Sequence, residues 1–256
     1  MTPSFNSGSD DPRPQSHREL RHTKIRTLLF ENSKQADVYV AETVATLIRE
    51  NNKAGLPTVL GLPTGSTPIG IYRELIRMRR KESLDFSRVI TFNLDEYWPM
   101  EPDSVHSYRR WMQESFFKHV NILSKNIHIP QGDLARNAVE KFCESYERKI
   151  KSVGGIQLQL LGIGRTGHIG FNEPGSSRDT TTRLVTLDPV TRSDAAGDFF
   201  GEENVPTQAI TMESARFSLR NECWRSPTAS RKHASSAGRW KRKSLMKCRR
   251  ASCRSI

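Results

Sequence analysis

Three short apolar segments, each ending in a polar loop, constrain the fold of this chain more than any other feature. The segments are residues 58–62, 89–94 and 156–163, and stretches with helical spacing of apolar residues lie between them. Strands that alternate with helices form a parallel sheet whose two faces are covered by helices. Ligands of such folds bind at the edge where the carboxyl ends of the strands meet. The sequence therefore predicts an α/β protein with a doubly wound, mostly parallel sheet and a functional site at that edge.

Terminal signals place the helices. We expect Ser33 to cap the first helix and Pro68 to lie in the first turn of the second, where its fixed backbone angle suits a helix. The pair Gly154-Gly155 is expected to end the last one. The expected helices are residues 34–52, 68–80, 107–119 and 135–152, and weaker strands are expected at residues 183–187 and 208–212.

Charge divides the chain into a nearly neutral body and a basic tail. The chain has 40 Lys and Arg against 28 Asp and Glu, but residues 213–256 hold 13 of the bases and only 2 of the acids. The N-terminus is rich in Ser, Pro, Asp and Arg and lacks an apolar signal segment. We therefore expect a disordered polar leader at residues 1–27, one α/β domain at residues 28–212 and a basic tail of low order at residues 213–256.

A lost base in the gene is a second explanation of the tail. One permitted set of codons for residues 213–220, read from the last base of the Met212 codon, spells Gly-Val-Gly-Thr-Ile-Leu-Ser-Ala. We hypothesise that one base was lost just after that codon, so that residues 213–256 are read out of frame. Sequencing the gene tests this, and a restored frame that is neither longer nor more apolar would contradict it.

Cysteine usage and apolar runs exclude further classes of protein. Cys143 is the one cysteine before the tail and no C-x-x-C pair occurs, so the sequence predicts neither a zinc site nor a disulfide framework. A lone cysteine fits the reducing cytoplasm, and no stretch approaches the roughly 20 apolar residues of a membrane helix. Because the body is nearly neutral, the tail predicts non-specific binding of polyanions and no specific nucleic-acid partner.

The loop after the first strand predicts an anion site. Residues 61–68 read GLPTGSTP, and backbone N–H groups at a helix N-terminus attract phosphate. We expect Thr64, Ser66 and Thr67 to add hydroxyl donors beside Gly65. A Walker A loop is excluded because no Gly-Lys-Ser/Thr follows, and a plain strand–helix turn with a threonine cap is the alternative.

Asp95 and Glu96 directly follow the second strand. Adjacent side chains of an extended chain point to opposite sides, so at least one of the two is expected to face the ligand crevice. A partly buried carboxylate has a raised pKa and can act as a general base. The pair is therefore a candidate for catalysis, and a helix cap or a solvated pair is the alternative.

The third loop, GRTGHIGFNE, carries His168 and, five residues later, Glu173. Its glycines let the backbone turn sharply and approach a ligand, and a histidine held by a carboxylate is a proton-transfer unit. We expect the pair to be catalytic, with a structural histidine as the alternative. The loop also matches the dinucleotide fingerprint G-x-G-x-x-G at residues 162–167. That fingerprint needs a helix at the glycines, which Gly170 and Pro174 disfavour, so NAD binding is not expected.

Together the motifs GLPTGSTP, FNLDEY and GHIGFNEP closely resemble those of the glucosamine-6-phosphate deaminase (isomerase) family, in the same order along residues 28–212. The resemblance implies a modified Rossmann-like fold without a nucleotide. It also implies a cytoplasmic enzyme that converts glucosamine 6-phosphate and water to fructose 6-phosphate and ammonia. Its ligand would be a small-molecule sugar phosphate, with neither a metal nor an organic cofactor, because positioned acid–base groups suffice. Family members are often homo-oligomers.

The resemblance also implies roles for single residues. Asp95 is expected to move a proton between C2 and C1 during isomerisation. His168, oriented by Glu173, is expected to assist opening of the sugar ring. Substrate and phosphate contacts are expected from Thr64, Gly65, Ser66, Thr67 and Glu96.

Three departures from the family pattern stand out. Thr166 lies two residues before His168, where the best-known members have an aspartate, and Gly197 lies near the place of their phosphate-binding arginine. Beyond Met212 the family continues with a Gly-Val-Gly-Thr segment, further strands and helices and a phosphate-binding lysine, so the C-terminal part of the fold is missing here. The shifted frame restores that segment. We therefore expect Glu173 to support His168 alone and this chain to be weakly active or inactive.

Three other functions stay open. A 6-phosphogluconolactonase-like hydrolase on the same fold needs no base at C2, so Asp95 would be dispensable for it. A non-catalytic sugar-phosphate sensor would bind sugar phosphate without turnover. A nucleic-acid-binding protein would depend on residues 213–256.

Overall fold

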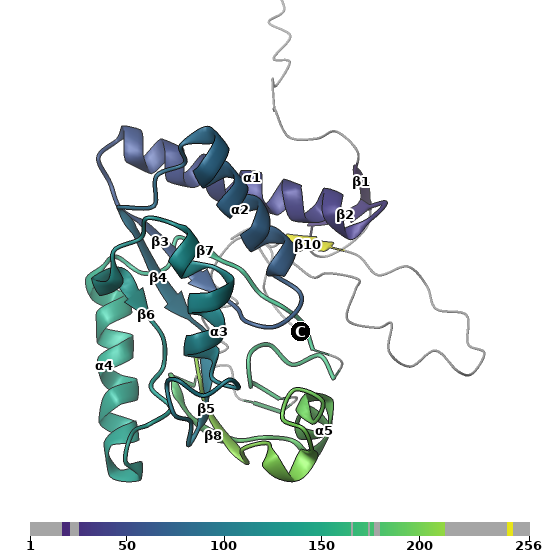
Figure 1. Cartoon of the computed structure of the whole chain (residues 1–256), viewed down its shortest axis with the longest axis vertical. Helices are drawn as coiled ribbons and strands as arrows, with labels where there is room; N and C mark the ends of the chain where they lie inside the picture. Colours follow the sequence, from purple (N-terminus) through teal and green to yellow (C-terminus); the bar gives the residue numbers. More distant parts are fainter. Residues whose placement is uncertain are drawn as a thin grey trace, which may run out of the picture.

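The computed structural model describes residues 17–20, 26–164, 166–173, 175–176, 180–212 and 245–247. Its central element is a four-stranded, wholly parallel sheet in the order β6-β4-β3-β7 (Figure 1). The strands are β3 (Thr58–Leu62), β4 (Val89–Asn93), β6 (Ile127–His128) and β7 (Leu158–Gln159). The predicted strands at residues 58–62 and 89–94 are thus confirmed. The predicted strand at residues 156–163 shrinks to two residues, because in the described ranges β7 pairs with β3 alone.

A second, antiparallel sheet follows the order β5-β9-β8. Its strands are β5 (Asp95–Trp98), β8 (Arg183–Thr186) and β9 (Gln208–Thr211). The two weaker predicted strands are therefore present, but they lie in this separate sheet and not in the parallel one. β5 was not predicted. Only Leu94 separates it from β4, so Asp95 lies at the junction of the two sheets.

A third sheet has the order β1-β2-β10 and is antiparallel. It contains β1 (His17–Leu20), β2 (Arg26–Phe30) and β10 (Leu245–Lys247). β1 lies within the predicted leader and β10 within the predicted basic tail. The remaining residues of those two segments, and with them the hypothesis of a lost base, lie almost wholly outside the described part of the chain.

The four predicted helices are present, with changes at their ends, and a fifth helix at residues 189–195 was not predicted. Asn32, not Ser33, caps the first helix, because its side-chain oxygen accepts the N–H of Gln35 at 3.0 Å. Pro68 is the N-cap of the second helix and not part of its first turn. The helices are α1 (Ser33–Lys53), α2 (Ile69–Glu82), α3 (Tyr108–Ser115), α4 (Val139–Ser152) and α5 (Pro189–Ala195), with 3-10 turns at Phe117–His119, Ser124–Asn126, Arg136–Ala138 and Glu202–Asn204.

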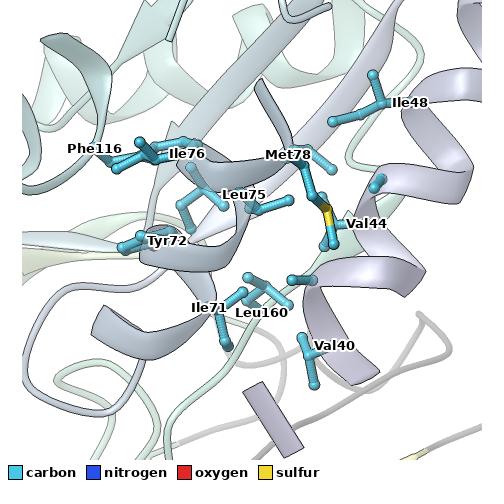
Figure 2. Packing of buried hydrophobic residues seen from close by; sticks show 14 of the residues in the cluster. Val40, Val44, Ile48, Ile71, Tyr72, Leu75, Ile76, Met78, Phe116 and Leu160 are labelled. Carbon is cyan, nitrogen blue, oxygen red and sulfur yellow. The ribbon is translucent and has the colours of Figure 1, made fainter. Parts of the chain in front are cut away.

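Helices cover both faces of the parallel sheet, as the doubly wound prediction requires. Leu60 and Leu62 of β3 pack with α1 and α2 in the largest core cluster. Val59, on the opposite face of the same strand, packs with Tyr146 and Ile150 of α4. Alternation along the strand therefore directs its side chains to two cores. Figure 2 shows the α1–α2 contact, where Val40, Val44 and Ile48 face Ile71, Leu75 and Met78.

None of the helices in the described ranges combines the length and the apolarity that crossing a bilayer requires.

Candidate active site

The three polar loops meet at one edge of the parallel sheet. The N–H of Leu94, at the end of β4, donates to the carbonyl of Leu62 at 3.3 Å, and the N–H of Leu160 donates to the carbonyl of Gly61 at 2.9 Å. The ends of β4 and β7 therefore flank the end of β3. Because all three strands are parallel, the loops that follow them leave from the same side. The predicted site residues thus lie on two neighbouring loops and at the start of β5 between them.

The first loop leads into α2 and leaves that helix's N-terminus open. The N-cap residue Pro68 forms no side-chain capping hydrogen bond, so the first N–H groups of this 14-residue helix suit an anion, although the carboxylate of Asp37 lies against Gly70 in the same turn. Gly65 has a φ of +90°, which an L side chain rarely adopts. Gly65 and Ser66 are exposed, whereas Thr64 and Thr67 are half-buried. The predicted cradle residues therefore surround a helix terminus suited to phosphate.

Asp95 is a buried carboxylate without a hydrogen-bond partner in the described residues. Its side chain is 7% exposed, and it lies against Gly170 in the loop that carries His168. A Cβ atom on Gly170 would be 3.2 Å from Asp95 Oδ2. Burial, and secondarily the charge of Glu96, raise the pKa of Asp95 to about 7. Near neutral pH, Asp95 can therefore both take and return a proton.

This raised pKa predicts a pH-dependent stability. An unfolded aspartate ionises near the model value of 3.8, whereas folded Asp95 keeps its proton to about pH 7. Between these values only the folded state binds the proton, so the free energy of unfolding falls as pH rises, by on the order of 4 kcal/mol, and then levels off. Denaturant unfolding across this range, compared with Asp95→Asn, measures the effect. Equal pH dependence in both proteins would contradict it.

Glu96 points away from Asp95 and caps α3. One carboxylate oxygen accepts the N–H groups of Tyr97 and Tyr108, both at 3.0 Å. The other accepts the N–H of Arg109 at 2.9 Å and the hydroxyl of Ser107 at 3.2 Å. Burial raises the pKa of Glu96, although these hydrogen bonds oppose the shift. Glu96 is 2% exposed and its two oxygens accept four hydrogen bonds, as the helix-cap alternative expects, and its predicted contact with substrate stays a prediction.

The loop of His168 folds back on itself through two backbone hydrogen bonds. The N–H of Gly164 donates to the carbonyl of His168 at 2.8 Å, and the N–H of Gly167 donates to the carbonyl of Gly164 at 3.1 Å. The imidazole ring then occupies the space that a side chain on residue 164 would fill, since a Cβ there would be 2.1 Å from His168 Nε2. The missing side chain of Gly164 therefore makes room for the histidine.

We expect Gly164→Ala to displace the His168 ring and to lower kcat of the proposed reaction roughly 100-fold, as misplacement of a reacting group by about 1 Å does. Steady-state kinetics measure the loss. Gly162→Ala is the matched control, because nothing lies within 4 Å of a Cβ at residue 162 in the same loop. Equal activity of the two variants would contradict the proposed role of the ring.

Glu173 and Thr166 hold the other side of the imidazole. Thr166 Oγ1 lies 2.8 Å from His168 Nδ1 and 3.4 Å from Glu173 Oε2, and Nδ1 lies 3.5 Å from the same carboxylate oxygen. The hydroxyl of Thr191 donates to Glu173 Oε1. The structure thus brings the predicted pair together, and it adds two threonines. Thr166 was noted in the sequence only as a departure, and Thr191 gave no signal.

β9 fixes the second half of this loop. The N–H of Phe171 donates to Thr211 Oγ1 at 3.1 Å, and Asn172 Nδ2 donates to the carbonyl of Met212 at 2.9 Å. Thr211 is also the partner of Asp95 across the β5–β9 ladder. A single strand therefore positions both the buried carboxylate and the histidine loop. These contacts join residues 40 or more positions apart, so no local pattern in the sequence could reveal them.

Arg183, Arg192 and His106 contact other protein groups. Arg183 donates to Asn172 Oδ1 and Thr180 Oγ1, both at 3.0 Å. Arg192 donates to the carbonyls of Glu202 and Val205, and His106 stacks on Phe199 with ring centroids 4.5 Å apart. In the described part of the chain, no group of three or more His, Cys, Asp or Glu side chains has a geometry that suits a metal ion.

Known proteins share both the sequence and the fold. The family model for glucosamine-6-phosphate isomerases/6-phosphogluconolactonase matches residues 31–194. A glucosamine-6-phosphate deaminase of Thermoanaerobacter sp. is 46% identical over 188 residues, which are 73% of this chain and 72% of that protein. A deaminase-like protein of Bacteroides thetaiotaomicron is 44% identical over 192 residues, which are 75% of this chain but only 29% of that longer protein.

A solved structure extends the similarity to three dimensions. A monomeric glucosamine-6-phosphate deaminase superposes with a TM-score of 0.71 at 38% identity, covering 76% of this chain and 78% of that one. The chain belongs to the glucosamine-6-phosphate isomerase/6-phosphogluconolactonase family.

Proposed function

We propose that this chain has the sequence of a glucosamine-6-phosphate deaminase, which converts glucosamine 6-phosphate and water to fructose 6-phosphate and ammonia. The observation that carries the proposal is Asp95, a buried carboxylate with a pKa raised to about 7, set against the loop of His168. Relatives at 44% and 46% identity that bear the deaminase name support it. The open N-terminus of α2 adds a place for the phosphate.

Asp95 acts as the base in the proposed reaction. In the open-chain sugar, its carboxylate removes the proton from C2 and returns it to C1, while the C1 carbonyl becomes an alcohol and the C2 amine becomes an imine. Water then adds to the imine carbon, and ammonia leaves to give the ketone. The base has to take up and release one proton in each turnover, which a pKa of about 7 favours.

His168 and Glu173 serve ring opening. In ring opening the anomeric hydroxyl loses a proton and the ring oxygen gains one. One imidazole nitrogen can take the proton from the hydroxyl and deliver it to the ring oxygen. Glu173 orients the ring from the opposite side, where its carboxylate oxygen lies 3.5 Å from Nδ1. Thr64, Gly65, Ser66, Thr67 and the first N–H groups of α2 bind the phosphate in this proposal.

The activity of this particular chain depends on residues 213–256. We propose that they are read out of frame and that the C-terminal part of the family fold is therefore missing, so that this chain is weakly active or inactive. We also propose a cytoplasmic location, which the buried free thiol of Cys143 supports. A homo-oligomer is a proposal for the full-length family form alone, since the solved relative is a monomeric enzyme.

Release of ammonia and fructose 6-phosphate from glucosamine 6-phosphate tests the proposed function. The assay compares this chain with a version in which one base is restored after the Met212 codon. Activity confined to the restored version would support both the deaminase and the lost base, whereas robust turnover by this chain would refute its predicted impairment. If both versions are inactive, the proposed deaminase activity is refuted. Hydrolysis of 6-phosphogluconolactone, or binding of sugar phosphate without turnover, would then identify a lactonase or a sensor.

A further inference from the structure

Thr166 lies between the imidazole of His168 and the carboxylate of Glu173. Its Oγ1 is 2.8 Å from His168 Nδ1, which is a good hydrogen-bond distance, whereas Nδ1 and Glu173 Oε2 are 3.5 Å apart. The hydroxyl, and not the carboxylate, is therefore the direct partner of the ring. The tight turn at residues 164–168 holds the threonine in this place.

The hydrogens of this cluster can be assigned from the chemistry of its atoms. An ionised carboxylate only accepts hydrogen bonds, whereas a hydroxyl donates one and also accepts. Among the described residues, the hydrogens in reach of Glu173 Oε2 are those of Thr166 Oγ1, at 3.4 Å, and His168 Nδ1. If the threonine donates to the carboxylate, it must accept from Nδ1–H. If the threonine donated its one hydrogen to Nδ1 instead, Nδ1 would carry no hydrogen, and Glu173 Oε2 would have no donor among the described residues. That arrangement is unfavourable because only 17% of the Glu173 side chain is exposed to water.

We propose that Thr166 is a positioning residue, whose bridging hydroxyl keeps the hydrogen of neutral His168 on Nδ1 and leaves Nε2 as the proton acceptor. Glu173 then acts on the imidazole through the hydroxyl. Thr191 binds the other oxygen of this carboxylate, because its hydroxyl donates to Glu173 Oε1. The effect of Thr166 on turnover rests on the proposed function, in which His168 takes a proton from the sugar. The position of the hydrogen on the His168 ring does not depend on that function.

The test reads the tautomer directly. In the chain labelled with ¹⁵N-histidine, two-bond and three-bond couplings between the ring nitrogens and the hydrogens on the ring carbons distinguish Nδ1–H from Nε2–H. The variant His168→Gln assigns the signals. We expect Nδ1–H in the unaltered protein and in Thr166→Ser, and a shift towards Nε2–H in Thr166→Val, which keeps the shape and removes the hydroxyl. Thr191→Val is the matched control, since it removes a hydroxyl from Glu173 without touching the ring.

Kinetics supply the second measurement. In the version of the enzyme that is active, Thr166→Val is expected to lower kcat roughly 10–100-fold with little change in KM, which is a part of what a positioned acid–base group contributes. Thr166→Ser, which keeps the hydroxyl, is expected to retain most of the parent kcat. Unchanged tautomers in Thr166→Val would overturn the inference even in an active enzyme. A tautomer that responds to Thr166→Val, in a protein that deaminates nothing in either reading frame, would refute the proposed function and leave the positioning role standing.

Discussion

Asp95→Asn is expected to lower kcat for ammonia release by about 10²–10⁴-fold, the range that a positioned general base contributes. The amide keeps the shape of the carboxyl group but cannot take the C2 proton. Since the carboxylate has no hydrogen-bond partner in the described residues and Asp95 is 7% exposed, the replacement breaks no hydrogen bond of the described structure. Steady-state kinetics on the active version of the enzyme measure the loss.

Stability separates this loss from misfolding. Above about pH 7, ionised Asp95 is a buried charge without a partner, so the asparagine variant is expected to unfold at an equal or higher denaturant concentration than the parent. Retention of more than about a tenth of the activity would eliminate Asp95 as the base, and a 6-phosphogluconolactonase-like chemistry, which needs none, would then fit better.

Glu96→Ala is expected to lower the free energy of unfolding by about 3–5 kcal/mol, because it leaves several buried donors at the start of α3 without an acceptor. Those donors are the N–H groups of Tyr97, Tyr108 and Arg109 and the hydroxyl of Ser107. Such a loss is a large fraction of the stability of an average domain. Equilibrium unfolding in urea measures it.

Glu96→Gln is the matched variant. The amide oxygen can still accept from Tyr97 and Tyr108, which share one carboxylate oxygen, so a smaller loss is expected. A stable Glu96→Ala protein with a raised KM for the sugar phosphate would return Glu96 to the substrate-binding role that the sequence predicted.

Local patterns predicted the elements that local physics determines. The apolar stripe of α1 and the buried runs of β3 and β4 stand out in the sequence, because their periodicity follows from which face is buried. β5 was missed because Asp95-Glu96-Tyr97-Trp98 resembles a polar loop, and it becomes a strand through its pairing with β9. Residues 156–163 were predicted to be a full strand because they are apolar, but a ladder also requires neighbours, and β7 has one in the described ranges.

The same distinction applies to the site. His168 and Glu173 were predicted as a pair because they are five residues apart in one loop, and the structure does bring them together. The substrate contact predicted for Glu96 stays a prediction, and its hydrogen bonds at the start of α3 could not be foreseen because those donors lie 11 to 13 residues further along the chain. The bridge by Thr166 escaped prediction because it depends on a distance of 2.8 Å that the backbone turn creates. The identities of the residues could therefore suggest the chemistry, but not which atom accepts each hydrogen bond.

The contacts of β9 set the order in which the molecule can be assembled. β9 pairs with β5, Asn172 and Phe171 bind Met212 and Thr211, and the N–H of Met212 donates to the carbonyl of Leu94 at 2.8 Å. Each contact closes a long loop, so the entropy of closing it opposes early formation. While the ribosome is still making the chain, the contacts that join Asp95 and the His168 loop through β9 cannot form until residues 208–212 have emerged. The chemistry of this protein is therefore acquired late in its synthesis, after the helices and the parallel strands already have their partners.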